Sequence, residues 1–432
     1  MRLPLWYLLE ALSWSSRLGT TDPAPPPDRT LTPSQSTSLS FNLRHVHAQS
    51  ANSSHILFAD VRPPSLSSRR LDEPELTFTL DTETILTHRP SSPAAFYAAR
   101  SGSRLAQTPI DLWVPDSIPA PNTSSRHTLH TLAKMTSNAY TSPSESDWYP
   151  LPSPFNSTNG TAPPSIPFGW EPDADGFRGH IFVSEDNATV VISIKGTSAG
   201  WIFGGGGPTV SKDKLNDNML FSCCCARVGP TWSTVCGCYG GSGKCDQRCL
   251  ETSVAKESLF YSVGVDLYNN VTYLYPNANI WLVGHSLGGS LASLLGSTFG
   301  SPVVAFEAPG ERLAAQRLHL PGPPNNNHIT HVLHTADPLA MGTCTGVSSV
   351  CGIAGYAMES HCHMGNIRRY DTISNLNWAA DIRTHGIRVI VEKLLADDWN
   401  TLTGHNETKE VPDFDNDDDC VDCYNWEFGD YK

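Results

Sequence analysis

The chain has 432 residues, a formal net charge of −14 at pH 7 and 39% hydrophobic residues. The apolar content is sufficient for a core, and the acidic balance excludes nucleic acid as a partner because no basic stripe is present to neutralise phosphates. The same charge argues against strong electrostatic attraction to anionic membranes at neutral pH.

The N-terminal part of the chain divides into three segments. Residues 3–14 form an apolar run behind Arg2, and this run is shorter than the roughly 20 residues that a membrane-spanning helix needs. We therefore expect residues 1–19 to be a signal peptide or a signal-anchor. Residues 20–40 are rich in Pro, Ser and Thr and are expected to be a linker. Residues 41–121 are expected to be a lead-in region packed against the main domain.

Residues 122–400 are predicted to form one α/β domain. Its expected elements are a helix over 127–140, a β-hairpin with strands 179–184 and 189–194, a helix over 252–275, buried strands over 280–283, 303–306 and 329–333, and a closing helix over 387–395. Strands that alternate with helices predict a mainly parallel sheet covered by helices on both faces. Residues 401–432 are expected to be an exposed acidic tail.

Seven of the twelve cysteines lie between Cys223 and Cys249. Seven N-x-[S/T] glycosylation sequons accompany them, at Asn52, Asn122, Asn156, Asn159, Asn187, Asn270 and Asn406. Sequons imply an oxidising secretory compartment, and the cysteine spacing matches no standard zinc site, so we expect disulfides and no metal. The segment 201–249 is either a disulfide-stapled excursion or a membrane-touching lid, since residues 201–203 and 219–221 are apolar.

Residues 284–288 read Gly-His-Ser-Leu-Gly and match the G-x-S-x-G pattern. An apolar strand precedes them and a helical pattern follows, which is the context of a nucleophile elbow. The glycines allow close backbone approach, and the helix directs N–H groups at an oxyanion that forms beside the serine. The sequence therefore predicts a serine hydrolase with Ser286 as its nucleophile.

A catalytic serine needs a histidine base and a carboxylate that orients this base. In α/β-hydrolases the acid and then the histidine follow the nucleophile along the chain. Asp337, just past a strand, is the preferred acid, and His385, before the last helix, is the preferred base. The alternatives left open are Asp371, Asp381, His361 and His363. The oxyanion hole is expected to combine the Leu287 N–H with a donor from the loop at Thr197.

Several motifs resemble the class 3 lipases. They are Ile-Lys-Gly-Thr at 194–197, Gly-His-Ser-Leu-Gly-Gly at 284–289 and Ala-Asp-Pro at 336–338. Further segments resemble one subfamily, the fungal autophagy-related vacuolar lipases, over roughly 41–432: the cysteine cluster and residues 146–149, 168–171, 178–182, 307–310, 360–363 and 422–428. The resemblance implies an α/β-hydrolase fold of class 3 lipase type with a disulfide-rich insertion. It also implies a Ser286, Asp337 and His385 triad that needs no cofactor.

The resemblance further implies a lumenal lipase that acts on phospholipids and triacylglycerols of vesicles inside the vacuole, such as autophagic bodies. Such a protein is expected to bind membrane phospholipids, including phosphoinositides. It is expected to travel as a single-pass type II membrane protein through the Golgi and multivesicular bodies or endosomes. Two alternatives are a secreted serine esterase or peptidase acting on soluble substrates, and a lipid-binding module with an inactive triad.

The histidine content suggests a pH effect. Protonating all sixteen histidines would convert the formal charge of −14 into +2. Acidification is therefore expected to remove repulsion from anionic membranes and switch on binding.

Overall fold

The computed structural model describes residues 37–50, 55–61, 77–101, 112–143, 145–149, 176–198, 209–227, 234–256, 259–404 and 409–431. The predicted signal segment 1–19 lies outside these residues, as does most of the predicted linker. Within the described ranges, no helix combines the length and apolar character needed to cross a membrane.

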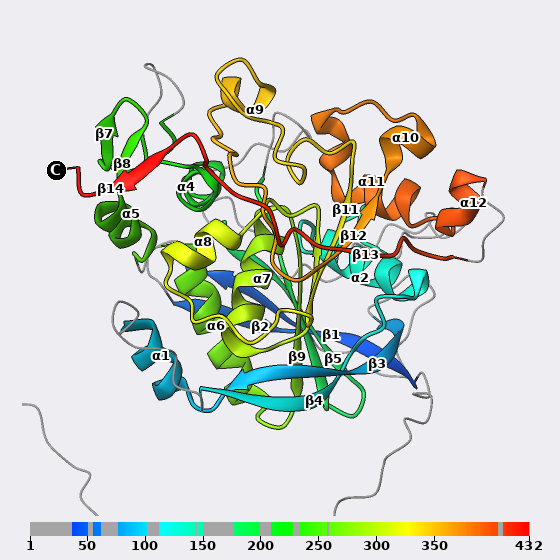
Figure 1. Ribbon diagram of the computed structural model, residues 1–432. Coiled ribbons are helices and arrows are strands. Elements are labelled where there is room, and N and C mark those ends of the chain that lie inside the picture. Colours follow the sequence, from blue (N-terminus) through cyan, green and yellow to red (C-terminus); the bar gives the residue numbers. More distant parts are fainter. Residues whose placement is uncertain are drawn as a thin grey trace, which may run out of the picture. The chain divides into compact units, whose positions relative to one another are not determined.

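A mixed sheet organises the fold (Figure 1). Its described strands follow the order β13-β12-β11-β10-β9-β6-β5-β1-β3-β4, with β2 paired to β1. Their bounds are β1 Thr37–Gln49, β2 Ile56–Asp60, β3 Thr77–Pro90, β4 Trp113–Pro121, β5 Arg178–Ser184, β6 Thr189–Ile194, β9 Asn279–His285, β10 Val303–Phe306, β11 Ile329–His334, β12 Asn366–Tyr370 and β13 Phe414–Asp415. Only the run from β6 through β9, β10 and β11 to β12 is parallel. The predicted α/β class is confirmed, but the sheet is mixed rather than mainly parallel.

The region expected as a lead-in packed against the main domain contributes strands to this sheet. β1 lies between β3 and β5, and it begins at Thr37, inside the predicted linker. A β-bulge shifts the register of β1 between Leu43 and His45. The apolar side chains that β1 buries are Phe41, Leu43, Val46 and Ala48. Because a bulge interrupts the alternation of period two, the strand does not stand out in the sequence.

Helices cover both faces of the sheet (Figure 1). One face packs against α2 (Arg126–Asn138), α11 (Ile387–Val389) and a π-helical turn (Ile390–Leu394). The other face packs against α4 Val210–Phe221, α5 Gln247–Val254, α6 Phe260–Leu274, α7 Leu287–Phe299 and α8 Arg312–Arg317. The remaining helical segments among the described residues are α1 Pro93–Ser101, α9 Val350–Ile353, α10 Thr372–Leu376, the 3-10 turn Ile382–His385 and α12 Trp399–Thr403. The single helix expected over 252–275 is therefore divided between α5 and α6.

All twelve cysteines pair as disulfides, as predicted. The pairs are Cys223–Cys423, Cys224–Cys245, Cys225–Cys236, Cys238–Cys249, Cys344–Cys351 and Cys362–Cys420. A small second sheet joins β7 (Tyr239–Gly241) and β8 (Lys244–Asp246) of the insertion to β14 (Glu427–Gly429) of the tail.

Part of the expected lid is a buried helix. Residues 219–221 end α4 and lie in the core, with exposures of 3%, 1% and 0%. An apolar residue pattern does not distinguish a surface lid from a packed helix, because both are rich in the same side chains. Residues 201–203, the other apolar part of that segment, lie outside the described residues.

Candidate active site

Ser286 lies in a sharp turn between the end of β9 and the start of α7. Its φ of 56° is left-handed, a conformation that costs a residue with a Cβ about 1–2 kcal/mol. A Cβ on Gly284 would lie 2.2 Å from the Gly288 oxygen, and a Cβ on Gly288 would lie 2.3 Å from the Ile194 oxygen. The G-x-S-x-G pattern therefore permits β6, β9 and α7 to pack closely around the serine.

Ser286, His385 and Asp337 form a continuous hydrogen-bond chain. Ser286 Oγ lies 2.9 Å from His385 Nε2, and His385 Nδ1 lies 2.7 Å from Asp337 Oδ2. Since a carboxylate only accepts, His385 Nδ1 donates and Nε2 is left to receive the serine proton. Burial alone raises the pKa of Asp337, but the contact with His385 outweighs it, so the net pKa lies below its usual range. The structure thus brings the three preferred residues together.

The four alternative residues are engaged elsewhere. Asp371 caps α10 by accepting from Ser374 N at 3.1 Å. Asp381 forms an ion pair with Arg383 two residues along the chain. The two alternative histidines, His361 and His363, contact the C-terminal tail.

His285, which precedes Ser286, links His385 to the loop after β6. Its Nε2 donates to the His385 carbonyl oxygen at 2.7 Å, so its Nδ1 accepts from the Tyr140 hydroxyl at 2.7 Å. The Tyr140 oxygen accepts from Gly196 N at 3.0 Å. Burial is the main cause that lowers the pKa of His285 to about 3, so the ring stays neutral. No sequence pattern distinguishes Tyr140, because at the end of the 127–140 helix it resembles one more apolar residue.

The loop after β6 lies beside the nucleophile, where the oxyanion hole is expected. A Cβ on Gly196 would lie 3.1 Å from Ser286 Cβ. Leu287 is the first residue of α7, so its N–H has no acceptor within that helix. Thr197 Oγ1 is 2.6 Å from Asp217 Oδ2, and burial is the main cause that raises the pKa of Asp217 to about 8. Asp217 was missed because it lies on α4, and no local pattern distinguishes it from a solvated helix carboxylate.

Known proteins share these motifs. The family profile described as Lipase (class 3) matches residues 250–341, which include Ser286 and Asp337. A protein named "Putative lipase ATG15" from Cryptococcus neoformans var. neoformans serotype D (strain B-3501A) is 47% identical over 379 residues, which cover 75% of this chain and 71% of that protein. The chain belongs to this family of fungal class 3 lipases.

The chain is also similar to other known proteins. The identically named protein of Saccharomyces cerevisiae (strain ATCC 204508 / S288c) is 46% identical over 323 residues, covering 73% of this lipase and 59% of that protein. Among solved structures, a triacylglycerol lipase from Penicillium expansum covers 56% of this lipase and 78% of its own chain at 16% identity, with a TM-score of 0.28. The fold assignment therefore follows from the sheet topology and the family, not from this superposition.

Three of the predicted glycosylation sites lie within the residues that the structure describes. Asn187 and Asn270 are exposed, and Asn122 is half-buried. The other four lie outside the described residues: Asn52, Asn156, Asn159 and Asn406.

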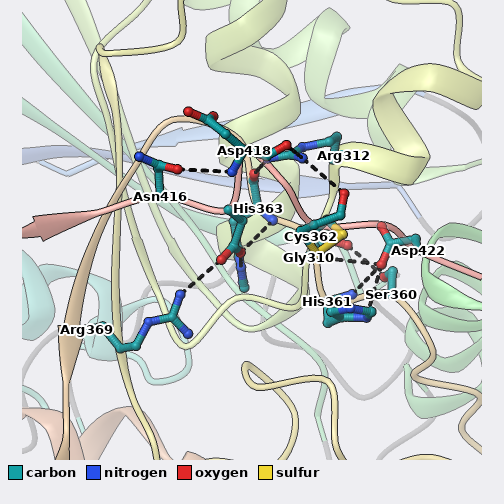
Figure 2. Close-up of a disulfide and its surroundings, with 12 residues drawn as sticks. Gly310, Arg312, Ser360, His361, Cys362, His363, Arg369, Asn416, Asp418 and Asp422 are labelled. Carbon is teal, nitrogen blue, oxygen red and sulfur yellow. Dashed lines mark hydrogen bonds and ion pairs between the residues drawn. A yellow bond between two sulfur atoms is a disulfide. The ribbon is translucent and has the colours of Figure 1, made fainter.

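The C-terminal tail is fastened to the lipase domain instead of lying free (Figure 2). Cys420 pairs with Cys362, and Asp422 accepts from the backbone N of His361 at 2.8 Å. On the other side, His363 Nδ1 lies 2.7 Å from Asp417 Oδ2. The expectation of an exposed tail is therefore only partly correct. Residues 413–416 are exposed, but disulfides and charged pairs hold the segment that follows.

His363 is positively charged in this arrangement. Its Nδ1 faces a carboxylate, and its Nε2 lies 2.9 Å from the Ala308 carbonyl oxygen. Neither partner donates, so both ring nitrogens must carry protons. Burial lowers the pKa of His363, but the Asp417 hydrogen bond and the charge of Glu311 raise it above its usual value.

We expect this pair to make the lipase more stable in acid. Because the folded pKa of His363 is raised, its stabilisation is complete below the unfolded pKa and is lost as pH rises through the folded value. The Tm should fall by a few degrees between about pH 6 and pH 8, and Asp417→Asn should reduce this dependence of Tm on pH. Thermal unfolding of each protein at about pH 6 and at about pH 8 measures the change in Tm. Asp413→Asn, which removes an exposed tail carboxylate paired with Lys409, should keep the wild-type slope, and equal slopes in all three proteins would contradict the assignment.

Proposed function

We propose that this lipase uses Ser286, His385 and Asp337 to hydrolyse the acyl esters of membrane phospholipids and triacylglycerols. The hydrogen-bond chain from Ser286 Oγ to His385 and on to Asp337 carries the proposal, with distances of 2.9 Å and 2.7 Å. It is the arrangement that serine hydrolases use to activate a hydroxyl nucleophile.

The mechanism follows from this chain. Ser286 Oγ attacks the ester carbonyl carbon while His385 Nε2 accepts the serine proton. The Leu287 N–H and the Thr197 hydroxyl stabilise the oxyanion of the tetrahedral intermediate. His385 then protonates the glycerol oxygen as it leaves, and a water activated in the same way hydrolyses the acyl-serine ester. Asp337 holds the imidazole in the required tautomer throughout.

A loop at the catalytic edge of the sheet supports an aggregated lipid substrate. Residues 338–358 contain no charged side chain, although the chain as a whole carries −14. The loop leaves the carboxyl end of β11, and β9 ends at the same edge because both strands are parallel to β10 (Figure 1). The Cys344–Cys351 disulfide closes it. Its exposed apolar side chains are Val347 at 53%, Val350 at 49% and Ile353 at 78%.

The proposal is tested by fatty acid release from phosphatidylcholine vesicles and from triacylglycerol emulsions, at about pH 5 and pH 7. A short-chain soluble ester is the comparison substrate. Preference for the soluble ester would favour a secreted esterase, and vesicle binding without any hydrolysis would favour a lipid-binding module. Vesicles with and without phosphoinositides test whether these head groups contribute to binding.

Ile353→Asp is expected to reduce vesicle hydrolysis but not hydrolysis of the soluble ester. A carboxylate at this exposed position opposes insertion of the loop among the acyl chains. A charged side chain at the centre of a membrane costs about 2.5–3.5 kcal/mol, and a side chain near the membrane surface carries only part of that cost. Vesicle hydrolysis should therefore fall about tenfold. Tyr273→Asp, at an apolar residue that is 86% exposed on α6, is the matched control and should have little effect. Equal losses on both substrates would remove the membrane-contact role of the loop.

A lumenal location is also part of the proposal. Six disulfides and the exposed sequons at Asn187 and Asn270 support passage through an oxidising secretory compartment. Delivery to the vacuole lumen through the Golgi and endosomes, as a type II membrane protein, remains a prediction from the family resemblance. Sensitivity of the cellular protein to endoglycosidase, and its location by immunofluorescence, test this route.

A further inference from the structure

Glu307 is a buried carboxyl group that the mechanism above does not use. It is the first residue after β10 and is 0% exposed. Its φ is 43°, a left-handed conformation that strains a residue with a Cβ. Its backbone N donates to the Val332 oxygen at 3.0 Å, which fixes it between β10 and β11.

The side chain of Glu307 faces the catalytic acid. Its carboxyl group shares a hydrogen bond with the Asp337 carboxyl group. Glu307 Oε2 also accepts from His334 N at 3.4 Å, and Oε1 lies 3.8 Å from His334 Nε2. The His334 Nε2 proton is directed to the Thr384 oxygen at 3.1 Å. Among the described residues, no N–H or O–H group donates a hydrogen bond to the buried Glu307 Oε1.

Two carboxyl groups that share a hydrogen bond must hold a proton between them. Asp337 Oδ2 accepts from His385 Nδ1 at 2.7 Å, and Oδ1 accepts from Leu339 N at 2.8 Å. Asp337 is therefore the ionised acceptor, and the proton belongs to Glu307. Burial and then the negative charge of Asp337 raise the pKa of Glu307 well above its usual value, which agrees with this assignment.

We propose that Glu307 is a positioning residue for the triad, a neutral carboxylic acid that donates a hydrogen bond to the Asp337 carboxylate. The inference rests on the proposed function of the triad. The donated bond fixes the Asp337 carboxylate against His385. It also draws negative charge away from that carboxylate, which weakens the attraction of Asp337 for a proton on His385.

The test compares Glu307→Gln with Glu307→Met. Both side chains match glutamate in length, but only the glutamine amide donates a hydrogen bond. Glu307→Gln should keep kcat/KM within about threefold, whereas Glu307→Met should lose about 10- to 100-fold, the range of a hydrogen bond to a charged group. In Glu307→Met the acidic limb of the kcat/KM profile should also move to higher pH, on the order of half a pH unit to one unit. The titratable groups that face Glu307 are Asp337 and His334, and His385 in turn faces Asp337.

The outcomes separate this inference from the proposed function. A wild-type protein without esterase activity would overturn the triad assignment, whereas an active wild type with identical profiles in all variants would overturn only the role of Glu307. A folded Glu307→Gln protein that is as inactive as Glu307→Met would also overturn the donor role, because the amide is then no substitute. Glu311→Leu removes a buried carboxyl of the same loop that contacts His331 instead. The Glu311→Leu variant should have a lower Tm but an unchanged acidic limb of the kcat/KM profile. If its acidic limb moved as far as that of Glu307→Met, the effect of Glu307→Met would be purely structural.

Discussion

Ser286→Ala is expected to abolish fatty acid release by the purified lipase, with a loss of about 10⁴-fold or more. The substitution removes Oγ, the atom proposed to attack the ester, which lies 2.9 Å from His385 Nε2. Alanine keeps a Cβ, so the strained turn with a φ of 56° is neither relieved nor worsened. The fold and vesicle binding should therefore be unchanged. Fatty acid release and vesicle sedimentation, measured on the same protein preparations, test both statements.

A second histidine provides the control. His361, one of the alternatives from the sequence, contacts Asp422 at 3.2 Å and lies in the tail attachment. His361→Asn should therefore keep most of the activity, whereas His385→Asn should lose about as much as Ser286→Ala, because triad members act as one unit. The triad assignment would be wrong if Ser286→Ala kept hydrolysis within about tenfold of the wild-type rate, or if His361→Asn alone lost as much activity as Ser286→Ala is expected to lose.

The elements that the sequence predicts well are those with a local signal. The elbow at 284–288 combines a buried strand, two required glycines and a following helix within one short segment, and Asp337 immediately follows a strand. By contrast, some residues of the site come from elements distant in sequence. Tyr140 contacts His285, Asp217 contacts Thr197 in the loop after β6, and Glu307 contacts Asp337. Their positions depend on the strand order, which places β6 next to β9 and β10 next to β11. No local pattern encodes that adjacency.

Burial also corrects the charge argument made from the sequence. Burial is the main cause that lowers the pKa of four described histidines to about 4 or below: His47, His130, His285 and His328. These remain neutral near pH 5, so at most twelve of the sixteen histidines offset the charge of −14. Counted on histidines alone, the formal charge stays negative. Acidification therefore weakens repulsion from anionic membranes without reversing its sign, and an apolar contact such as the 338–358 loop must supply attraction.

Thr197→Val is expected to reduce kcat about 100-fold or more, within the range observed when one oxyanion-hole donor is removed. Valine matches threonine in shape, so packing around the loop after β6 is kept while the hydroxyl is lost. Thr197→Ser restores the hydroxyl and should recover most of the rate. Steady-state hydrolysis of a soluble ester measures this without interference from membrane binding. If the kcat of Thr197→Val were unchanged, the Thr197 hydroxyl would not be an oxyanion donor, and backbone N–H groups alone would stabilise the oxyanion.

The same donor should make activity depend on pH through Asp217, whose pKa burial raises to about 8. Below that pH the protonated Asp217 carboxyl donates to Thr197 Oγ1, 2.6 Å away, and leaves the threonine proton for the oxyanion. Above it, the carboxylate accepts the threonine proton and withdraws it from the substrate. Activity should therefore fall as pH rises through about 8, and Asp217→Asn should remove this alkaline limb because the amide donates at every pH. An alkaline limb that persists unchanged in Asp217→Asn would assign it to another group and restrict Asp217 to a packing role.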